Sequence, residues 1–218
     1  MPNVARGIAI ALLLASFSGC SLFVMAGKAI LGDPQVSSEF RLHTGIDLTD
    51  GDDSVLILCT APHGIVGQFP SLQIDIVDRM TRTLKTRKVK VIPSDDVATW
   101  FDDHGEWGDF SELAKKFDAK YVMHVNVQAF TYKVPDSETL LQGSSHGRVL
   151  VYAASSDDDA EVPIRQVFDR SFKIHFPTSY PVPRENESDE IFVERFMDRV
   201  ALHIAQIFYD HPFSENIH

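Results

Sequence analysis

The chain has 218 residues, 44% of them hydrophobic, and a formal net charge of −11. A chain of this length and hydrophobic content can fill the core of one domain. The acidic balance argues against nucleic-acid binding, because that binding depends on clustered Lys and Arg that displace counterions from phosphates. It also argues against a broad electrostatic attachment to anionic lipid headgroups.

The beginning of the chain has the three-part pattern of a secretory signal peptide. Arg6 gives a short positive segment, residues 7–15 are apolar, and small residues lead to Cys20. The apolar run is too short for a permanent transmembrane helix, which needs about 20 apolar residues. We therefore expect residues 1–19 to be removed, and we exclude them from the fold.

The sequence Phe17-Ser18-Gly19-Cys20 resembles the lipobox of bacterial lipoproteins. The resemblance implies cleavage between Gly19 and Cys20, and a diacylglycerol and palmitate on that cysteine. Several acyl chains, each buried methylene contributing about 0.8 kcal/mol, hold a protein firmly on a bilayer. Ser21 stands where Asp would favour retention at the inner membrane, so the outer membrane is expected, with the rest of the chain facing the periplasm. The alternative is an ordinary signal peptide followed by an unrelated cysteine.

The rest of the chain is predicted to be a tether, one domain and a tail. Residues 20–53 contain several Gly and Ser residues and a Pro, which is typical of a tether. A single α/β domain is expected over residues 54–212, with a tail at residues 213–218. The domain opens with a continuous apolar run over residues 54–60, which predicts a buried strand. An amphipathic helix follows over residues 71–86.

Shorter elements are predicted in the middle of the chain. Val89–Ile92 is expected to be a strand inside the sheet, ended by Pro93. Ser94 is expected to cap the next helix. Asp109 has the capping-box spacing to Glu112 and predicts another helix. The remaining elements are strands at residues 120–134, 146–154 and 162–176, and a helix at residues 188–209 with the apolar stripe Phe192, Phe196, Val200, Ile204 and Phe208.

This order, β-α-β-α-α-β-β-β-α, predicts an α/β fold with a mixed sheet of about five strands and helices packed on it. The first two strands should be parallel and joined by a right-handed crossover, and the later ones antiparallel. Alternation along residues 120–134 puts His124 and Phe130 on one face and Met123 and Val125 on the other.

The segment Phe110–Val125, a helix followed by Tyr-Val-Met-His-Val, resembles a recurring phrase in one superfamily of envelope proteins. The phrase occurs in the amino-terminal domain of the Tol translocation protein, in curli-secretion lipoproteins and in lipoproteins that activate penicillin-binding proteins. The similarity covers residues 54–209. It implies a non-enzymatic role in protein binding or envelope assembly, without identifying the partner.

The nine histidines raise the alternative of a small metal-dependent or hydrolytic enzyme. His124, His146 and His175 lie on three predicted strands and could meet on one sheet face. No histidines have the spacing of a zinc motif, so we predict no metal site and no cofactor.

Other candidate motifs are also interpreted as structural. Gly64–Gly67 lacks the Lys-Ser or Lys-Thr of a phosphate loop and is expected to be a turn in a loop. Asp157–Asp159 lacks the spacing of a calcium loop and is expected to be a solvated hairpin. Cys59 lies in an apolar run and is interpreted as a buried structural thiol. Four carboxylates are close together in the sequence: Asp102, Asp103, Glu106 and Asp109. We interpret them as solvent-exposed loop residues, so no catalytic residue is predicted.

The sequence therefore predicts a membrane-anchored envelope lipoprotein that binds or assembles with other proteins. Its expected partners are the lipid bilayer, through acylated Cys20, and an envelope protein. The long strand Val162–Phe176 is expected at a sheet edge, where an incoming strand could pair. A subunit of a secretion apparatus is a further alternative.

A Cys20→Ser change tests the lipid anchor. It should release the protein from the membrane fraction or leave its precursor uncut, because serine cannot carry the thioether-linked lipid. Cell fractionation and the size of the chain on a gel measure both outcomes. Normal cleavage together with normal membrane retention would show that the lipoprotein prediction is wrong.

Overall fold

A computed structural model describes residues 33–105, 109–155 and 164–216. The predicted signal peptide, Cys20 and Asp157–Asp159 lie outside the described residues. The chain divides into two compact units. In the smaller one, β1 (Gln35–Val36) pairs antiparallel with β7 (His211–Pro212), and a 3₁₀ turn follows over Phe213–Asn216.

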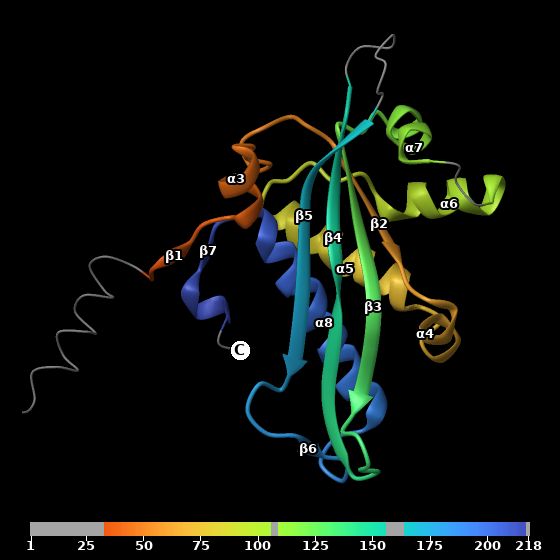
Figure 1. Ribbon diagram of the computed structural model, residues 1–218, viewed down its shortest axis with the longest axis vertical. Coiled ribbons are helices and arrows are strands. Elements are labelled where there is room, and N and C mark those ends of the chain that lie inside the picture. The colour runs from red at the N-terminus through yellow and green to blue at the C-terminus, as the bar shows by residue number, and fades with distance from the viewer. Residues whose placement is uncertain (1–32, 106–108, 156–163, 217–218) are drawn as a thin grey trace, which may run out of the picture. The chain divides into compact units, whose positions relative to one another are not determined.

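The larger unit, Ser37–Asp210, contains the mixed five-stranded sheet that the sequence predicts (Figure 1). Along the sheet the order is β2-β3-β4-β5, and β6 also pairs with β4. The β2–β3 pair is parallel and the other pairs are antiparallel. The strands are β2 (Val55–Thr60), β3 (Tyr121–Lys133), β4 (Leu140–Ala154), β5 (Ile164–Phe176) and β6 (Val182–Pro183).

Six helices of the larger unit lie within the described residues: α3 (Glu39–Thr44), α4 (His63–Gln68), α5 (Leu72–Thr86), α6 (Ser94–His104), α7 (Phe110–Phe117) and α8 (Asp189–Ala205). Asp109 caps α7 as predicted, because its carboxylate accepts from the backbone N–H groups of Ser111 and Glu112. Ser94 does not cap α6: Pro93 holds the N-cap position, and the Ser94 hydroxyl instead donates to Asp78. None of the described helices is long and apolar enough to cross a membrane.

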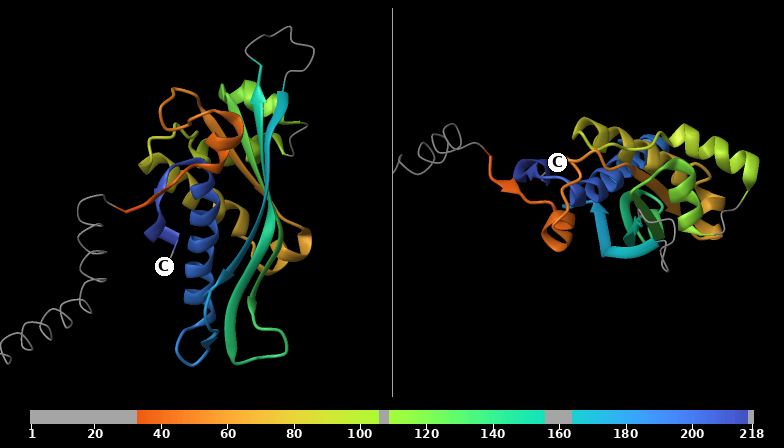
Figure 2. Two further views of the ribbon diagram at one scale, coloured as in Figure 1. Left: turned by 60° about the vertical axis from the view of Figure 1, so that its left-hand side comes forward. Right: turned by 90° about the horizontal axis from the view of Figure 1, so that it is seen from above.

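The main core lies between the sheet and the helices α5 and α8, which cover one of its faces (Figures 1 and 2). The predicted stripe of α8 is confirmed, because all five of its residues are buried. The helix itself ends at Ala205, and a 3₁₀ turn over Gln206–Phe208 places the last of them, Phe208.

A smaller core covers the opposite face at the β2 end of the sheet. Leu56, Leu58 and Val122 pack there against Val97 and Trp100 of α6, with Leu113 of α7 in the same cluster. β2 is therefore buried on both faces, which explains its continuous apolar run.

Three predictions about single segments need correction. Val89–Ile92 is not a strand inside the sheet: it makes an isolated parallel bridge, Val55 to Val91, beside β2. Gly64–Gly67 is not a loop but part of α4. Phe130 lies on the main-core face and not with His124, because a bulge in β3 after Val127 shifts the alternation by one residue.

The larger unit begins before the boundary predicted at residue 54. Phe40 of α3 is fully buried and Leu48 is 2% exposed, and both belong to the main core. The Phe40 ring packs edge-on against Phe168 of β5 at 5.3 Å between centroids. Residues 37–53 therefore complete the core, although their Gly and Ser content is typical of a tether.

A Phe196→Ala change tests the packing of α8 on the sheet. The ring is fully buried and stacks on Phe130 at 4.8 Å between centroids, so its loss should cost roughly 3–5 kcal/mol. Urea unfolding of the purified chain measures the free energy. Ile191→Ala, at an exposed position of the same helix, is the control and should cost far less. Equal stability of the Phe196 variant and the natural chain would contradict the predicted core.

Candidate functional site

The structure does not bring the three sheet histidines together in one group. His124 lies opposite Leu150 in the ladder, whereas His146 lies opposite Ala129 and His175 opposite Ser144. His124 is half-buried, and the other two are exposed. Within the described part of the chain, no three His, Cys, Asp or Glu side chains are grouped so that they could hold a metal ion.

The contacts of His124 join neighbouring elements of the fold. Its Nε2 lies 2.8 Å from the hydroxyl of Thr60 at the end of β2, and its ring lies 5.2 Å from that of Phe110 in α7. Burial lowers the pKa of His124, because the imidazolium loses hydration there. The neutral side chain therefore links β2, β3 and α7.

The predicted carboxylate candidates are dispersed. Asp109 serves as the cap of α7, and the Ser111 hydroxyl and two backbone N–H groups lower its pKa. Asp102 and Asp103 are exposed near the end of α6. Glu106 lies outside the described residues, as do Gly19, Cys20 and His218.

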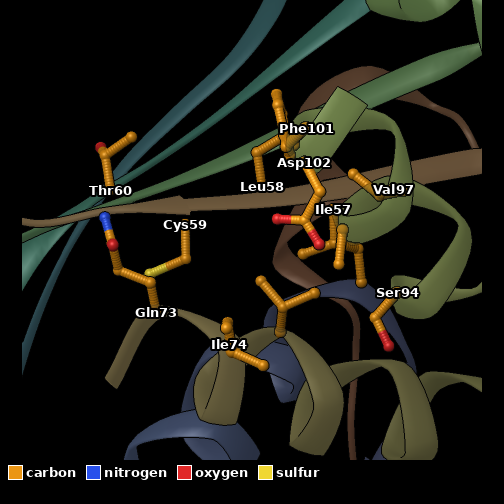
Figure 3. Close-up of a pocket in the computed structure, with 12 residues that line it drawn as sticks. Ile57, Leu58, Cys59, Thr60, Gln73, Ile74, Ser94, Val97, Phe101 and Asp102 are labelled. Atoms are coloured by element: carbon orange, nitrogen blue, oxygen red, sulfur yellow. The ribbon is translucent and has the colours of Figure 1, made fainter. Parts of the chain in front are cut away.

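The candidate site is a cavity of ≈ 280 Å³ where β2, α5 and α6 meet, which the sequence analysis did not predict (Figure 3). We call it the α5–α6 groove. Of the twelve described residues that line it, only Asp102 carries a charge. Its size is close to the lower limit of small-molecule pockets. Its main apolar walls are Ile57 and Cys59 of β2, Ile74 and Val77 of α5, and Ala98 and Phe101 of α6.

The outer edge of β2 forms the floor of the groove, where Ile57 is 2% exposed and Cys59 is half-buried. Next to it, the Val55 N–H donates to the Lys90 carbonyl, and the Val55 carbonyl accepts from the Ile92 N–H. Both backbone groups of Val55 therefore point away from β3. Backbone direction alternates along a strand, so the N–H and C=O groups of Ile57 and Cys59 point the same way. Among the described residues, no hydrogen bond pairs these four groups.

Cys59 is not arranged as a nucleophile. Burial raises the pKa of its thiol to about 12, so almost no thiolate is present at neutral pH. Figure 3 shows its sulfur and the Asp102 carboxylate directed to the same side of β2, toward the helix that carries Ile74. The Thr60 side chain points to the other side of the strand, consistent with its contact to His124.

The groove therefore offers apolar contact and unpaired backbone groups, with one carboxylate beside them. Buried backbone groups are normally paired, so the edge of β2 is suited to hydrogen-bond a bound molecule. Such an arrangement binds a ligand that has both apolar side groups and amide-like polar groups.

Comparison with known proteins gives similarity of structure only. No protein-family model matches the chain, and no curated protein matches it in sequence. The lipoprotein GNA1162 from Neisseria meningitidis is 13% identical, with 70% of this chain and 98% of that chain covered and a TM-score of 0.37. The PelC dodecamer from Paraburkholderia phytofirmans is 11% identical, with 81% and 96% covered and a TM-score of 0.42. The LpoB C-terminal domain from Salmonella enterica is 9% identical, with 63% and 95% covered and a TM-score of 0.36.

One of these neighbours is itself a lipoprotein. At these identities and TM-scores the likeness carries no argument about function, which rests on the geometry of the chain itself.

His124 should make the stability of the chain depend on pH. Because burial lowers its pKa, the unfolded chain binds more protons than the folded one below the ordinary histidine pKa of 6.5. The contribution of neutral His124 is therefore complete above that pH and is lost as the pH falls toward the lower, folded-state pKa. Urea unfolding at about pH 7.5 and about pH 5.5 should show the loss.

A His124→Gln variant should lose less stability between these two pH values, because glutamine does not titrate. His146→Gln, at an exposed position, is the matched control and should behave like the natural chain. The same pH dependence in the His124 variant as in the natural chain would show that other groups cause it.

Proposed function

We propose that this chain is a lipid-anchored protein of the bacterial cell envelope that binds another protein at the α5–α6 groove and catalyses no reaction. The observation that carries the proposal is the unpaired edge of β2, at Ile57 and Cys59, inside an apolar groove. A protein partner has the apolar side chains and backbone amides that such a groove recognises.

The chemistry of the groove favours binding over catalysis. The thiol of Cys59 has a raised pKa, and no histidine, lysine or second carboxylate accompanies Asp102 among the described residues of the groove wall. General acid–base and nucleophilic mechanisms need a base within hydrogen-bond reach of the reacting group. The groove wall does not contain such a pair among the described residues.

The place of the protein in the cell rests on the sequence. The apolar run, the small residues and Cys20 support export and lipid attachment, and Ser21 supports the outer membrane, with the larger unit in the periplasm. In this arrangement the lipid holds the chain at the membrane and leaves the groove free for an envelope protein.

A photo-crosslinking amino acid at Ile74 tests the binding role in living cells. Ile74 is 60% exposed at the groove, so the probe should join the full chain to one discrete protein partner. The probe at Ile191, which is 56% exposed on α8, is the matched control and should not capture that partner. Adducts that are the same at both positions would contradict a specific role of the groove.

Metal analysis and a screen for esterase, phosphatase and peptidase activity test the enzyme alternative on the purified full chain. We expect no activity that depends on His124 or His146. Stoichiometric zinc, lost together with an activity in His124→Ala or His146→Ala, would replace the binding proposal with a metal-dependent enzyme.

A further inference from the structure

The chain itself makes the first part of a parallel strand beside β2 and then leaves it. Lys90 and Ile92 use the outward backbone groups of Val55, but the following Pro93 has no N–H to continue the ladder. Pro93 is the N-cap of α6, so the chain turns into a helix at this point. The next residues of that strand would lie beside Ile57 and Cys59. The groove occupies this position instead.

The walls of this place suit the side chains of an added strand. Successive side chains of a strand point to opposite faces. On one side an added strand would meet Ile74 and Val77 of α5, and on the other Ala98 and Phe101 of α6. Both walls are apolar, so the groove can enclose an apolar side chain while the backbone pairs with β2.

The surroundings of the groove are acidic. Asp102 lies in its wall, and α6 also carries Asp95, Asp96 and Asp103, all exposed. The sequence contains no Lys or Arg between Lys90 and Lys115.

Basic groups of α5 do not neutralise this side. Arg79 forms ion pairs with Glu194 and Asp198 of α8, away from the groove. Arg82 donates back to the Asp78 carbonyl, at the end of the groove where Ser94 lies and two turns of α6 before Asp102. Lys85 follows farther toward the end of α5. The field at the groove therefore favours a cationic segment.

We infer that the α5–α6 groove binds an extended, basic segment of a partner protein, which pairs as a short strand with Ile57 and Cys59. One apolar side chain fills the cavity, and a Lys or Arg of the segment faces Asp102. This inference rests on the proposed binding function and adds the form and charge of the partner. A second copy of the chain fits less well, because two copies of net charge −11 repel each other.

The probe is a fluorescein-labelled peptide, Lys-Val-Lys-Phe-Lys-Val-Lys, titrated with the purified full chain in detergent and followed by fluorescence anisotropy. Three companion peptides separate the contributions. One replaces Lys by Glu, one replaces Val and Phe by Ser, and one carries N-methyl groups on its backbone amides. We expect the first peptide to bind most tightly and its affinity to fall as salt is added.

Variants of the chain locate the binding. Ile74→Ser should weaken it about 5- to 10-fold through lost apolar contact, and Asp102→Asn about 2- to 5-fold, as for an exposed ion pair. Ile191→Ser is the control for the exposed isoleucine. Asp136→Asn is the control for the charge, because asparagine tolerates the positive φ of that residue (60°). Neither control should change the affinity.

Amide hydrogen exchange gives a second readout that does not depend on the variants. The bound peptide should slow exchange at the N–H groups of Ile57 and Cys59, because these groups become hydrogen-bonded. Equal binding of the N-methylated peptide, or unchanged exchange at both groups, would overturn the strand-like form of the partner.

The remaining outcomes separate this inference from the proposed function. Equal or tighter binding of the Glu peptide would overturn the basic partner. Binding of none of the peptides, with the crosslink at Ile74 intact in cells, would overturn the inference and leave the binding function standing. Sedimentation of the chain tests whether it associates with itself. Self-association that is lost in the Ile74→Ser variant would overturn the inference, because the groove would then bind a second copy of the chain.

Discussion

The contact between Phe196 of α8 and the sheet determines how the larger unit is assembled. The ring stacks on Phe130 at 4.8 Å between centroids and lies parallel to Phe176 at 6.4 Å. It lies directly over Gly143 of β4, where an added Cβ would come within 2.5 Å of the ring. The helix can approach this closely only because residue 143 has no side chain. One aromatic ring therefore fixes α8 against three strands.

The position of α8 determines one wall of the groove in turn. α5 lies beside α8 and is joined to it by the two ion pairs of Arg79. The buried residues Ile76, Met80 and Leu84 of α5 belong to the same core as the α8 stripe. With that face of α5 fixed, the helix presents Ile74 and Val77 to the groove.

The two edge strands of the sheet, β2 and β5, differ in how well their backbones could pair with an added strand. The predicted edge position of the last long strand is confirmed, because β5 ends the order β2-β3-β4-β5. Arg165, Arg170 and Lys173 are exposed on β5, and such charges protect an edge against indiscriminate pairing. At the β2 edge the unpaired groups lie inside an apolar groove. The sequence suggests pairing at β5, whereas the groove that we propose as the binding site lies at β2.

The sequence predicts the parts of the fold that depend on local periodicity. The stripe of α8 and the apolar run of β2 are visible in the sequence because neighbouring positions alone determine them. The bulge after Val127 and the burial of Phe40 could not be predicted, because they depend on partners far away in the chain. The groove was missed for the same reason, since its walls come from β2, α5 and α6. Pro93, two residues after the bridging Val91, is the signal that could have indicated an unfinished edge.

The unreactive thiol of Cys59 fits the binding role and the export that we propose. Exported proteins work where thiols are readily oxidised, and the thiolate is the form that reacts. With its pKa raised to about 12, Cys59 stays a thiol and acts as a small apolar wall residue. A larger side chain would fill part of the groove, and serine would add one more polar group to an apolar wall. The small, apolar thiol of Cys59 thus matches the shape and polarity that the proposed binding requires.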